Sequence, residues 1–472
     1  MKEVLRGLHE VALIGLFNAL LRTERSPFNL RHSPGMRCLK SLLQSQWYTP
    51  EQLTLIQVGK AKRLLRQAYE DAPYYRKAFE RVGFHPEDFS RMEQLSALPV
   101  LTKSDIQNHR DELLCLTATP GSYYRNQTGG STGHPLVFCQ SWEYEAWGLA
   151  DIWRNFMMCG FRPGERKVFL WGSDYDSRAH RGWKNRVVQD LLRENTVWIN
   201  TFELTEERLA EAARTVERFR PRLIVAYVSS ATLLASYIRE HGIKIRPRAI
   251  QTSAEVLSGA QRRLLEEVFA CPVFDRYGCR EVGNIAHECE AHEGLHLLEE
   301  NNYTEFLDDA GLPVSPGETG TITVTNLNNS VMPLIRYQPG DLGRPAAGLC
   351  SCGRGLARME VVDGRTADVI RSPSGKLLHG EFFTHLFYKL AGVRQFQVVQ
   401  TSLERVEIRI VPMRGFDKEH ACRFLSEAIR EHGDPAFQVT VTLYERIPSS
   451  ASGKYRFVYS ELTTCTKERI DL

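Results

Sequence analysis

Asn126-Gln-Thr-Gly-Gly-Ser-Thr-Gly-His-Pro135 is the most informative stretch of this chain, because Thr128 to Gly133 are all glycines or hydroxyl-bearing residues. Glycine lets backbone N–H groups approach a phosphate closely, and hydroxyl groups donate hydrogen bonds to phosphate oxygens. The stretch therefore predicts a polyphosphate-binding loop, although a solvated surface turn explains it equally well when it is taken alone. It is not a Walker loop, because no lysine follows its last glycine.

The composition is that of an ordinary globular protein with a small-molecule partner. A chain of 472 residues is too long for one compact core and favours two or three domains. Its 60 Lys and Arg residues nearly balance 57 Asp and Glu residues, and no basic run stands out. The sequence therefore does not indicate a nucleic-acid-binding protein.

The cysteines and the amino-terminal residues indicate a cytoplasmic protein without an integral membrane segment. Eleven cysteines are an odd number, and no convincing secretion signal precedes them, which favours reduced thiols over a disulfide framework. The apolar run from Val11 to Leu21 is interrupted by Asn18 and is too short to span a bilayer. It predicts an amphipathic helix packed on the protein, with peripheral membrane attachment as the less favoured alternative.

Helices are expected in the first part of the chain and β/α units in the middle. Helix starts are predicted at Thr49-Pro50-Glu51 and at Leu101-Thr-Lys-Ser-Asp105, within a helical segment 1–115. From about 165 to 285, apolar runs alternate with helix-like segments, which predicts a parallel sheet whose ligands bind beyond the carboxyl ends of its strands. The runs are Val168 to Trp171, Leu223 to Val228, Ala249 to Thr252 and Val273 to Tyr277, and the helix-like segments are Thr205 to Phe219, Ala231 to His241 and Ser258 to Phe269.

A smaller α+β domain is predicted beyond about residue 365. Apolar and polar residues alternate over 406–410 and 437–443, which is typical of half-exposed strands. A helix-like segment from Asp417 to His432 separates the two strands. We therefore expect an α/β N-terminal domain of residues 1–364 and an α+β C-terminal domain of residues 365–472.

The segment Thr128 to Pro135 resembles the nucleotide loop of the acyl-adenylate-forming (AMP-binding) superfamily, in its phenylacetate-CoA ligase and CapK-like branch. Four further segments match in the same order, so the resemblance runs from about Thr49 to Arg456. It implies an N-terminal domain of layered sheets and helices and a mobile C-terminal lid. It also implies an enzyme that uses ATP and Mg²⁺ to convert a small carboxylic acid into an acyl-adenylate, releasing pyrophosphate.

The resemblance assigns roles to residues at the ends of predicted strands. It implies that the loop residues Thr128, Gly129, Gly130, Ser131, Thr132 and Gly133 hold the triphosphate. It further implies contacts with the adenosine or its metal ion from Ser253, Ala254, Glu255, Tyr277, Gly278, Glu281, Asp341 and Arg365. An aromatic face suits a purine and a carboxylate suits Mg²⁺, so Tyr277 is expected to stack on the base and Glu281 to bind the ion. Asp341 is expected to accept the ribose hydroxyls, although a Gly-Asp pair alone favours an ordinary turn.

The segment Ile447-Pro-Ser-Ser-Ala-Ser-Gly-Lys-Tyr-Arg456 resembles the terminal lysine loop of the same superfamily. The resemblance implies that Lys454 bridges the substrate carboxylate and the α-phosphate, where negative charge builds up. Taken alone, Lys454 would be a solvated surface charge. Residues 372–380 lack the sequence type found there in CoA ligases, so the acceptor is left open among an amine, CoA and a carrier thiol.

A structural zinc site is predicted from cysteines and histidines in two clusters. Cys350-Ser-Cys352 is a tight chelating pair, and Cys289 and His296 complete a tetrahedral set of thiolate and imidazole ligands. His287 and His292 are rivals for the histidine position. The alternative is a set of buried thiols beside a solvated, histidine-rich turn.

Two other functions compete with the ligase. One is a nucleotidyltransferase that leaves AMP on its substrate, and the other is a non-catalytic, zinc-stabilised nucleotide-binding scaffold. The acid is not identified by the sequence, since Trp142, Trp147 and Tyr227 are explained by core packing as well as by an acyl site. The oligomeric state is equally open.

Overall fold

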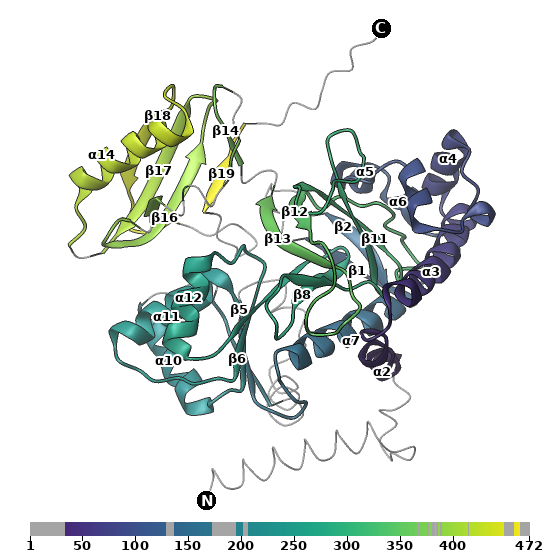
Figure 1. Ribbon diagram of the computed structural model, residues 1–472, viewed down its shortest axis with the longest axis horizontal. Helices are drawn as coiled ribbons and strands as arrows, with labels where there is room; N and C mark the ends of the chain where they lie inside the picture. Colours follow the sequence, from purple (N-terminus) through teal and green to yellow (C-terminus); the bar gives the residue numbers. More distant parts are fainter. Residues whose placement is uncertain are drawn as a thin grey trace, which may run out of the picture. The chain divides into compact units, whose positions relative to one another are not determined.

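The computed structural model describes two compact units, one ending at Val362 and the other beginning at Asp363. The residues that it describes are 34–128, 136–171, 195–201, 206–365, 369–374, 377–379, 383, 386–387, 389–413, 415–447 and 457–462 (Figure 1). The predicted helix from Val11 to Leu21 lies outside these ranges. Each unit has a hydrophobic core of its own.

The first unit begins with a series of helices. They are α2 (Pro34–Ser45), α3 (Pro50–Asp71), α4 (Pro73–Val82), the 3₁₀ turns η2 (Pro86–Asp88) and η3 (Met92–Ala97), α5 (Lys103–Asn108) and α6 (Arg110–Leu113). Both predicted helix starts are confirmed: Thr49 caps α3 through a capping box with Gln52, and Thr102 caps α5 through one with Asp105. Within the described ranges, no helix is long and apolar enough to cross a membrane.

The predicted parallel β/α units form one half of an eleven-stranded sheet. The strands are β3 (Lys167–Leu170), β4 (Thr196–Ile199), β5 (Leu223–Tyr227), β6 (Ala249–Ser253) and β7 (Val273–Cys279), and the helices are α10 (Glu206–Phe219), α11 (Val228–Glu240) and α12 (Gly259–Phe269). These five strands pair in parallel, in the order β7-β6-β5-β3-β4. The four predicted strands and three predicted helices are confirmed, except that α11 already begins at Val228, where the sequence predicts the end of a strand; β4 was not predicted.

Alternate side chains of β5 fill two separate cores. Ile224 and Ala226 pack with α11 and α12, which Figure 1 shows together beside β5 and β6. Leu223 and Val225 point the other way and pack with Phe156, near the end of α7 (Trp142–Met158). All four β5 residues are buried, because successive side chains of a strand face opposite sides of a sheet and both sides are covered here.

The other half of the sheet is mainly antiparallel, and the sequence did not predict it. It contains β8 (Gly283–Glu288), β9 (Leu295–Leu297), β10 (Asn302–Leu307), β11 (Gly320–Asn326), β12 (Asp341–Pro345) and β13 (Arg358–Arg365). Its strand order is β10-β11-β12-β13-β9-β8, and β8 pairs with β7 to join the two halves. A separate hairpin pairs β1 (Tyr123–Gln127) with β2 (Val137–Ser141).

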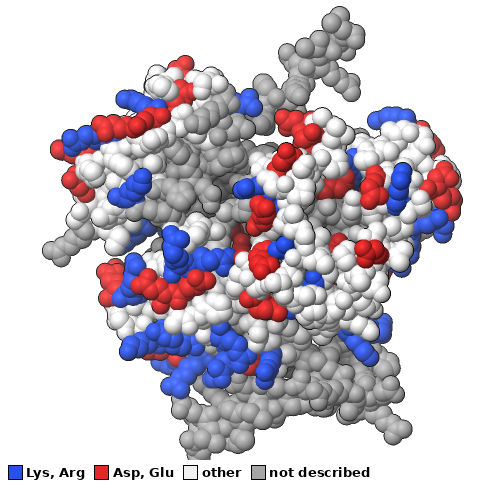
Figure 2. Space-filling view, viewed as in Figure 1, with Lys and Arg blue, Asp and Glu red and all other residues white. Residues whose placement is uncertain are grey.

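Basic residues gather at the amino ends of three parallel strands. An arginine immediately precedes each of β3, β5 and β6, and hydrogen bonds from Arg222 N to Arg166 O (2.7 Å) and from Arg248 N to Arg222 O (2.8 Å) hold these turns side by side. Figure 2 shows Lys and Arg side chains concentrated beside α10 and β6. The fold thus brings together charges that the sequence distributes over separate segments.

The second unit is the predicted α+β domain. Its four-stranded sheet has the order β18-β17-β16-β19, built from β16 (Val393–Gln400), β17 (Arg405–Pro412), β18 (Gln438–Leu443) and β19 (Val458–Ser460). The short strands β14 (Val369–Arg371) and β15 (Leu377–His379) form a second sheet. The predicted helix is α14 (Lys418–Ala428), followed by a π-helical turn, η6 (Ile429–Gly433). As the alternation predicts, Val406, Ile408 and Ile410 are buried in the core of this unit.

Replacement of Leu265 by alanine should destabilise the first unit strongly. Leu265 is fully buried between α12 and the parallel strands, so its loss leaves a cavity that costs about 2–5 kcal/mol. Leu264, its neighbour in the chain, is only partly buried and provides the matched control. Urea unfolding followed by circular dichroism should show a clearly smaller loss for Leu264→Ala, and equal losses would contradict this packing.

Candidate functional site

The end of β6 is joined to the start of α11 by a carboxylate. Glu255 accepts hydrogen bonds from Ser229 N (2.6 Å) and Ser229 Oγ (2.9 Å), in the first turn of α11. A carboxylate there is stabilised by the free N–H groups and the positive end of the helix dipole. Between Ser253 and Glu255, Ala254 has a φ of 72°, in the left-handed region that a residue with a side chain rarely adopts. The carboxyl end of β6 is therefore a sharply turned, fixed segment.

Two reciprocal hydrogen bonds connect the end of β7 with the segment leading into β12. The Tyr277 hydroxyl donates to Asp341 Oδ2 (2.8 Å), and the Tyr337 hydroxyl donates to Glu281 Oε1 (2.8 Å). All four residues are buried. Tyr277 and Glu281 are thus cross-linked twice to a segment about 60 residues further along the chain. The structure brings together Tyr277, Glu281 and Asp341, to which the resemblance assigns the base, the metal ion and the ribose.

The turn after Tyr277 is held from two further directions. Gln140 on β2 donates through Nε2 to Arg280 O (2.9 Å) and Glu281 O (3.2 Å). Across the hairpin, a Cβ placed on Gly278 would lie 2.4 Å from Gly283 O, so only glycine fits there. The backbone that carries Glu281 is therefore fixed by contacts as well as by its own turn.

Three residues at this edge were missed by sequence reasoning. Tyr337 and Gln140 hold Glu281 and its turn, and Arg276 precedes Tyr277 on β7. Tyr337 lies within the segment that resembles the family, but neither its burial nor its partner can be read from one chain. Arg276 had a usable signal, because two consecutive charged residues, Asp275 and Arg276, inside an otherwise apolar run need an explanation.

The predicted phosphate loop is described only at its ends. Thr128 N donates to Leu136 O (2.9 Å), and Leu136 N donates to Thr128 Oγ1 (3.0 Å), which closes the base of the loop between β1 and β2. The loop residues Gly129, Gly130, Ser131, Thr132 and Gly133 lie outside the described residues, as do Lys454 and the side chain of Arg365.

The predicted zinc ligands form a compact cluster. One ligand atom from each of Cys289, His296, Cys350 and Cys352 lies within 4.8 Å of all the others. Cys289 Sγ lies 3.6 Å from Cys350 Sγ, and His296 Nε2 lies 3.4 Å from Cys352 Sγ. Burial lowers the pKa of His296 to about 4, so its imidazole is neutral at physiological pH, as a metal ligand must be.

The two rival histidines have other partners. His287 Nε2 lies 3.2 Å from Gln251 Oε1, and His292 Nδ1 lies 3.4 Å from Glu288 Oε2. Neither belongs to the group of four. The geometry therefore favours His296 over both.

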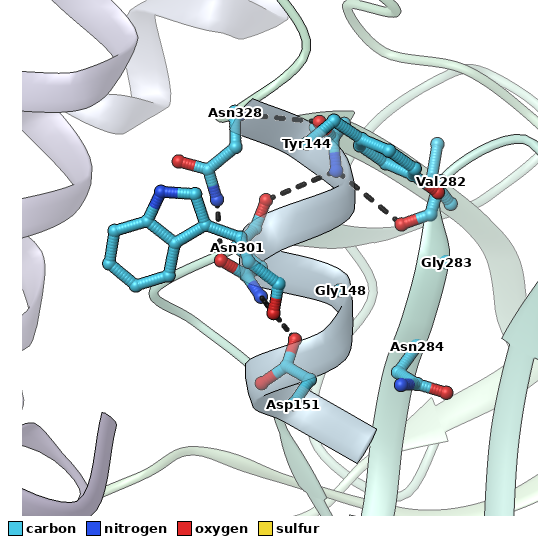
Figure 3. A pocket seen from close by; sticks show the side chains of 10 residues that line it. Tyr144, Gly148, Asp151, Val282, Gly283, Asn284, Asn301 and Asn328 are labelled. Carbon is cyan, nitrogen blue, oxygen red and sulfur yellow. Dashed lines mark hydrogen bonds between the residues drawn. The ribbon is translucent and has the colours of Figure 1, made fainter. Parts of the chain in front are cut away.

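A small cavity lined by asparagine side chains, here called the polar cavity, lies between α7 and strands β8 and β11. Figure 3 shows the ring of Tyr144 near Val282, with amide side chains along the cavity wall. Asn301 Nδ2 donates to Asp151 and Trp147 O, and Asn328 Nδ2 donates to Asn301 Oδ1. Burial raises the pKa of Asp151 to about 7. The amide side chains of the wall are hydrogen-bonded to one another, and the cavity has room for about one water molecule, so it does not suit an apolar ring.

The three aromatic residues weighed as acyl-site candidates lie apart. Trp147 lines the polar cavity, with Lys60 Nζ 3.5 Å from its ring centre. Trp142 is 53% exposed and donates to Gly121 O. Tyr227 ends β5, and its ring centre lies 4.2 Å from that of Trp171. Of the three, Tyr227 lies at the carboxyl edge of the parallel strands.

Comparison with known proteins gives a consistent set of relatives. Residues 370–461 match the family described as CapK C-terminal domain. Over 393 residues the chain is 25% identical to a phenylacetate-coenzyme A ligase of Thermus thermophilus, covering 81% of this chain and 86% of the relative. Over 331 residues it is 26% identical to a phenylacetate-coenzyme A ligase of Aromatoleum evansii, covering 68% and 72%.

A similar fold is found among solved structures. A 2-hydroxyisobutyryl-CoA ligase, in the postadenylation state with its acyl-adenylate, matches with a TM-score of 0.71 and 20% identity. The match covers 88% of this chain and 91% of that one. At this identity the match establishes the fold: a large mixed α/β domain followed by a small α+β domain.

Replacement of Gly278 by alanine should distort the hairpin that carries Glu281. The added Cβ would meet backbone atoms, which cannot rotate away as a side chain could. Gly59→Ala, in the exposed interior of α3 with no atom within 4 Å of the new Cβ, is the control and should be neutral or stabilising by about 0.5–1 kcal/mol. Thermal unfolding should therefore show a lowered midpoint for Gly278→Ala alone, and an unchanged midpoint would refute the close approach.

Proposed function

We infer that this chain belongs to the acyl-adenylate-forming (AMP-binding) superfamily, in its phenylacetate-CoA ligase and CapK-like branch. Within that family we infer that it is an ATP-dependent, AMP-forming ligase. It adenylates a carboxylic acid and transfers the acyl group to a thiol, for which CoA is the acceptor best supported by the named relatives. The observation that carries the proposal is the reciprocal pair of hydrogen bonds, Tyr277 with Asp341 and Tyr337 with Glu281. These bonds place an aromatic ring and two carboxylates at the end of one strand.

The proposed reaction needs no nucleophile from the protein. A carboxylate oxygen of the acid attacks the α-phosphorus of ATP, and the bond from that phosphorus to the bridging oxygen of pyrophosphate breaks. Positioning and electrostatic stabilisation then supply the rate enhancement. Tyr277 would stack on adenine, Asp341 would accept the ribose hydroxyls, and the segment around Ser253, Ala254 and Glu255 would border the base.

Glu281 is the proposed Mg²⁺ ligand. A carboxylate oxygen is the type of ligand that Mg²⁺ prefers, and the Tyr337 hydroxyl holds this carboxylate in place. When bound, the ion would offset the charge of the departing pyrophosphate. Lys454 would supply the cation between the substrate carboxylate and the α-phosphate, with Thr128 to Gly133 around the β- and γ-phosphates and Arg365 near the ribose.

We further propose a structural zinc ion bound by Cys289, His296, Cys350 and Cys352. Four protein ligands leave no open coordination position, so the role is structural. Cys289 follows β8 and His296 lies on β9, whereas Cys350 and Cys352 lie in the loop before β13. Zinc would thus fix the β8–β9 hairpin. Its first strand, β8, pairs with β7, the strand that carries Tyr277. None of the ten cysteines of the described residues is in a disulfide, which suits the reducing cytoplasm that we propose as the location.

Lys454→Ala should abolish adenylation while preserving ATP binding. Pyrophosphate exchange into ATP, measured over a panel of carboxylic acids, reports the first half-reaction without assuming an acceptor. The wild type should exchange with at least one acid, and the variant should lose about 100-fold or more of that rate because a cation at the developing charge is missing. ATP affinity, measured by calorimetry, should change little.

Trapping with hydroxylamine distinguishes the alternatives to the ligase. Only an activated acyl group yields a hydroxamate, so a product that carries AMP without hydroxamate would indicate a nucleotidyltransferase. ATP binding without any turnover would indicate a scaffold. CoA, an amine and a phosphopantetheinyl carrier, supplied in parallel, then identify the acceptor.

Cys350→Ser should remove the zinc and lower thermal stability. The purified wild type should contain about one zinc per chain by elemental analysis, because the ligand set is complete. Cys271→Ser, a buried thiol outside the cluster, is the control and should keep the metal. Wild-type protein that lacks zinc after expression in zinc-supplemented medium would rule the ion out.

A further inference from the structure

Arg276 occupies an unusual place at the carboxyl end of β7. It directly precedes Tyr277, so the two side chains point to opposite faces of the sheet. Its Nε and Nη2 donate to Ser253 Oγ at 3.0 and 2.7 Å, and its Nη1 donates to Asn284 Oδ1 at 2.8 Å. The guanidinium carbon lies 5.9 Å from the ring centre of Trp171. Its position is thus set by neighbours on both adjoining strands.

These partners of Arg276 are uncharged, which sets it apart from other inward-facing arginines of the chain. Arg154 binds two carboxylates, at 2.8 and 2.9 Å, Arg262 binds Glu288 at 2.7 Å, and Arg336 binds Glu305 at 3.1 Å. Within the described residues, Arg276 has no ion pair. A cation that is partly withdrawn from water without a directly bonded anion is unfavourable, and burial lowers the pKa of Arg276 to about 10 although the nearby Asp275 carboxylate opposes this shift.

The guanidinium keeps donors for a ligand. Of its five N–H groups, three donate to Ser253 and Asn284, and the described residues offer no acceptor to the remaining N–H on Nη1 and on Nη2. A guanidinium with free N–H groups binds carboxylate or phosphate oxygens in preference to neutral groups. Its neighbours fix its orientation before a ligand arrives, so little side-chain entropy remains to be lost on binding.

The position of Arg276 points to the acid rather than to ATP. Trp171 follows β3, Tyr227 ends β5 and Ser253 ends β6, so Arg276 lies along the edge where open α/β sheets bind ligands. Tyr277 packs on the opposite face, in the same apolar cluster as Phe138 of β2, the strand that follows the phosphate loop. Tyr277, with its partner Asp341, therefore lies on one face of β7, whereas Arg276 lies on the other.

We propose that the acid adenylated at this site carries a second anionic group, a carboxylate or a phosphate, that is bound by Arg276. The inference rests on the proposed function and extends it, since it names the class of acid. The second anion would remain on the acyl group throughout, so the bonds formed and broken are those given above. Asn284, which also borders the polar cavity, would hold the guanidinium toward this anion.

The test compares matched acids in pyrophosphate exchange with the full-length protein. Each pair differs only in the second anion: succinate with butyrate, glutarate with pentanoate, 4-carboxyphenylacetate with phenylacetate, and 3-phosphonopropionate with butyrate. In the pair that contains its best substrate, the wild type should favour the acid with the second anion by about 100-fold or more in kcat/KM. The reason is that a site built for a polar group rejects an analogue that lacks it. The carboxylate and phosphonate pairs distinguish the two possible anions.

Arg276→Gln should remove that preference and affect ATP binding far less. We expect kcat/KM for the acid with the second anion to fall about 100-fold, so that the preference within the pair vanishes or inverts. The KM for ATP should change less than about twofold. Arg263→Gln removes the same charge from an exposed arginine on α12 and is the matched control, so it should behave as wild type. Arg276→Lys, which keeps the charge but not the fork of donors, should be intermediate.

The outcomes separate this inference from the proposed function. If the wild type prefers the acids without a second anion, or if Arg276→Gln lowers stability but retains the preference for the acid with two anionic groups, the inference is wrong while the ligase assignment stands. If the wild type exchanges pyrophosphate with no acid, both are wrong. The wild-type comparison needs no variant, so it decides between these outcomes even if Arg276→Gln fails to fold.

Discussion

Two buried hydrogen bonds between tyrosine hydroxyls and carboxylates are the constraint on which the candidate site depends. Tyr277 with Asp341, and Tyr337 with Glu281, join two segments that have the same four-residue spacing and lie about 60 residues apart. A buried hydrogen bond to a charged group contributes about 1.5–3 kcal/mol, and the loss of one partner leaves the other unsatisfied. Neither segment can shift without breaking both bonds, so the ring and the carboxylates keep fixed relative positions.

The parallel half of the sheet was predictable and the antiparallel half was not, for a physical reason. Strands such as Leu223–Tyr227 are apolar throughout, because helices cover one face and α7 covers the other. In β11, by contrast, Thr323, Thr325 and Asn326 are as buried as Ile322 and Val324. Buried polar residues erase the alternation from which strands are recognised, and a three-residue strand such as β9 is too short to show any period.

The candidate site shows a similar division. Resemblance placed Tyr277, Glu281 and Asp341, but only the fold shows that each carboxylate has a tyrosine partner and that Gln140 supports the turn between them. The four cysteine and histidine residues were proposed from their ligand chemistry, whereas only the fold favours His296 over His287 and His292. Arg276 was overlooked because its environment depends on Ser253 and Asn284, which belong to two neighbouring strands.

The alternation of β7 also limits how this protein can change over evolutionary time. Tyr277 and Arg276 are consecutive, so their side chains point to opposite faces of the same strand. Insertion or deletion of one residue before them would exchange the two faces and destroy both at once. New acid specificities should therefore arise through point substitutions at position 276 and its neighbours, while the length of the segment between α12 and β8 stays constant.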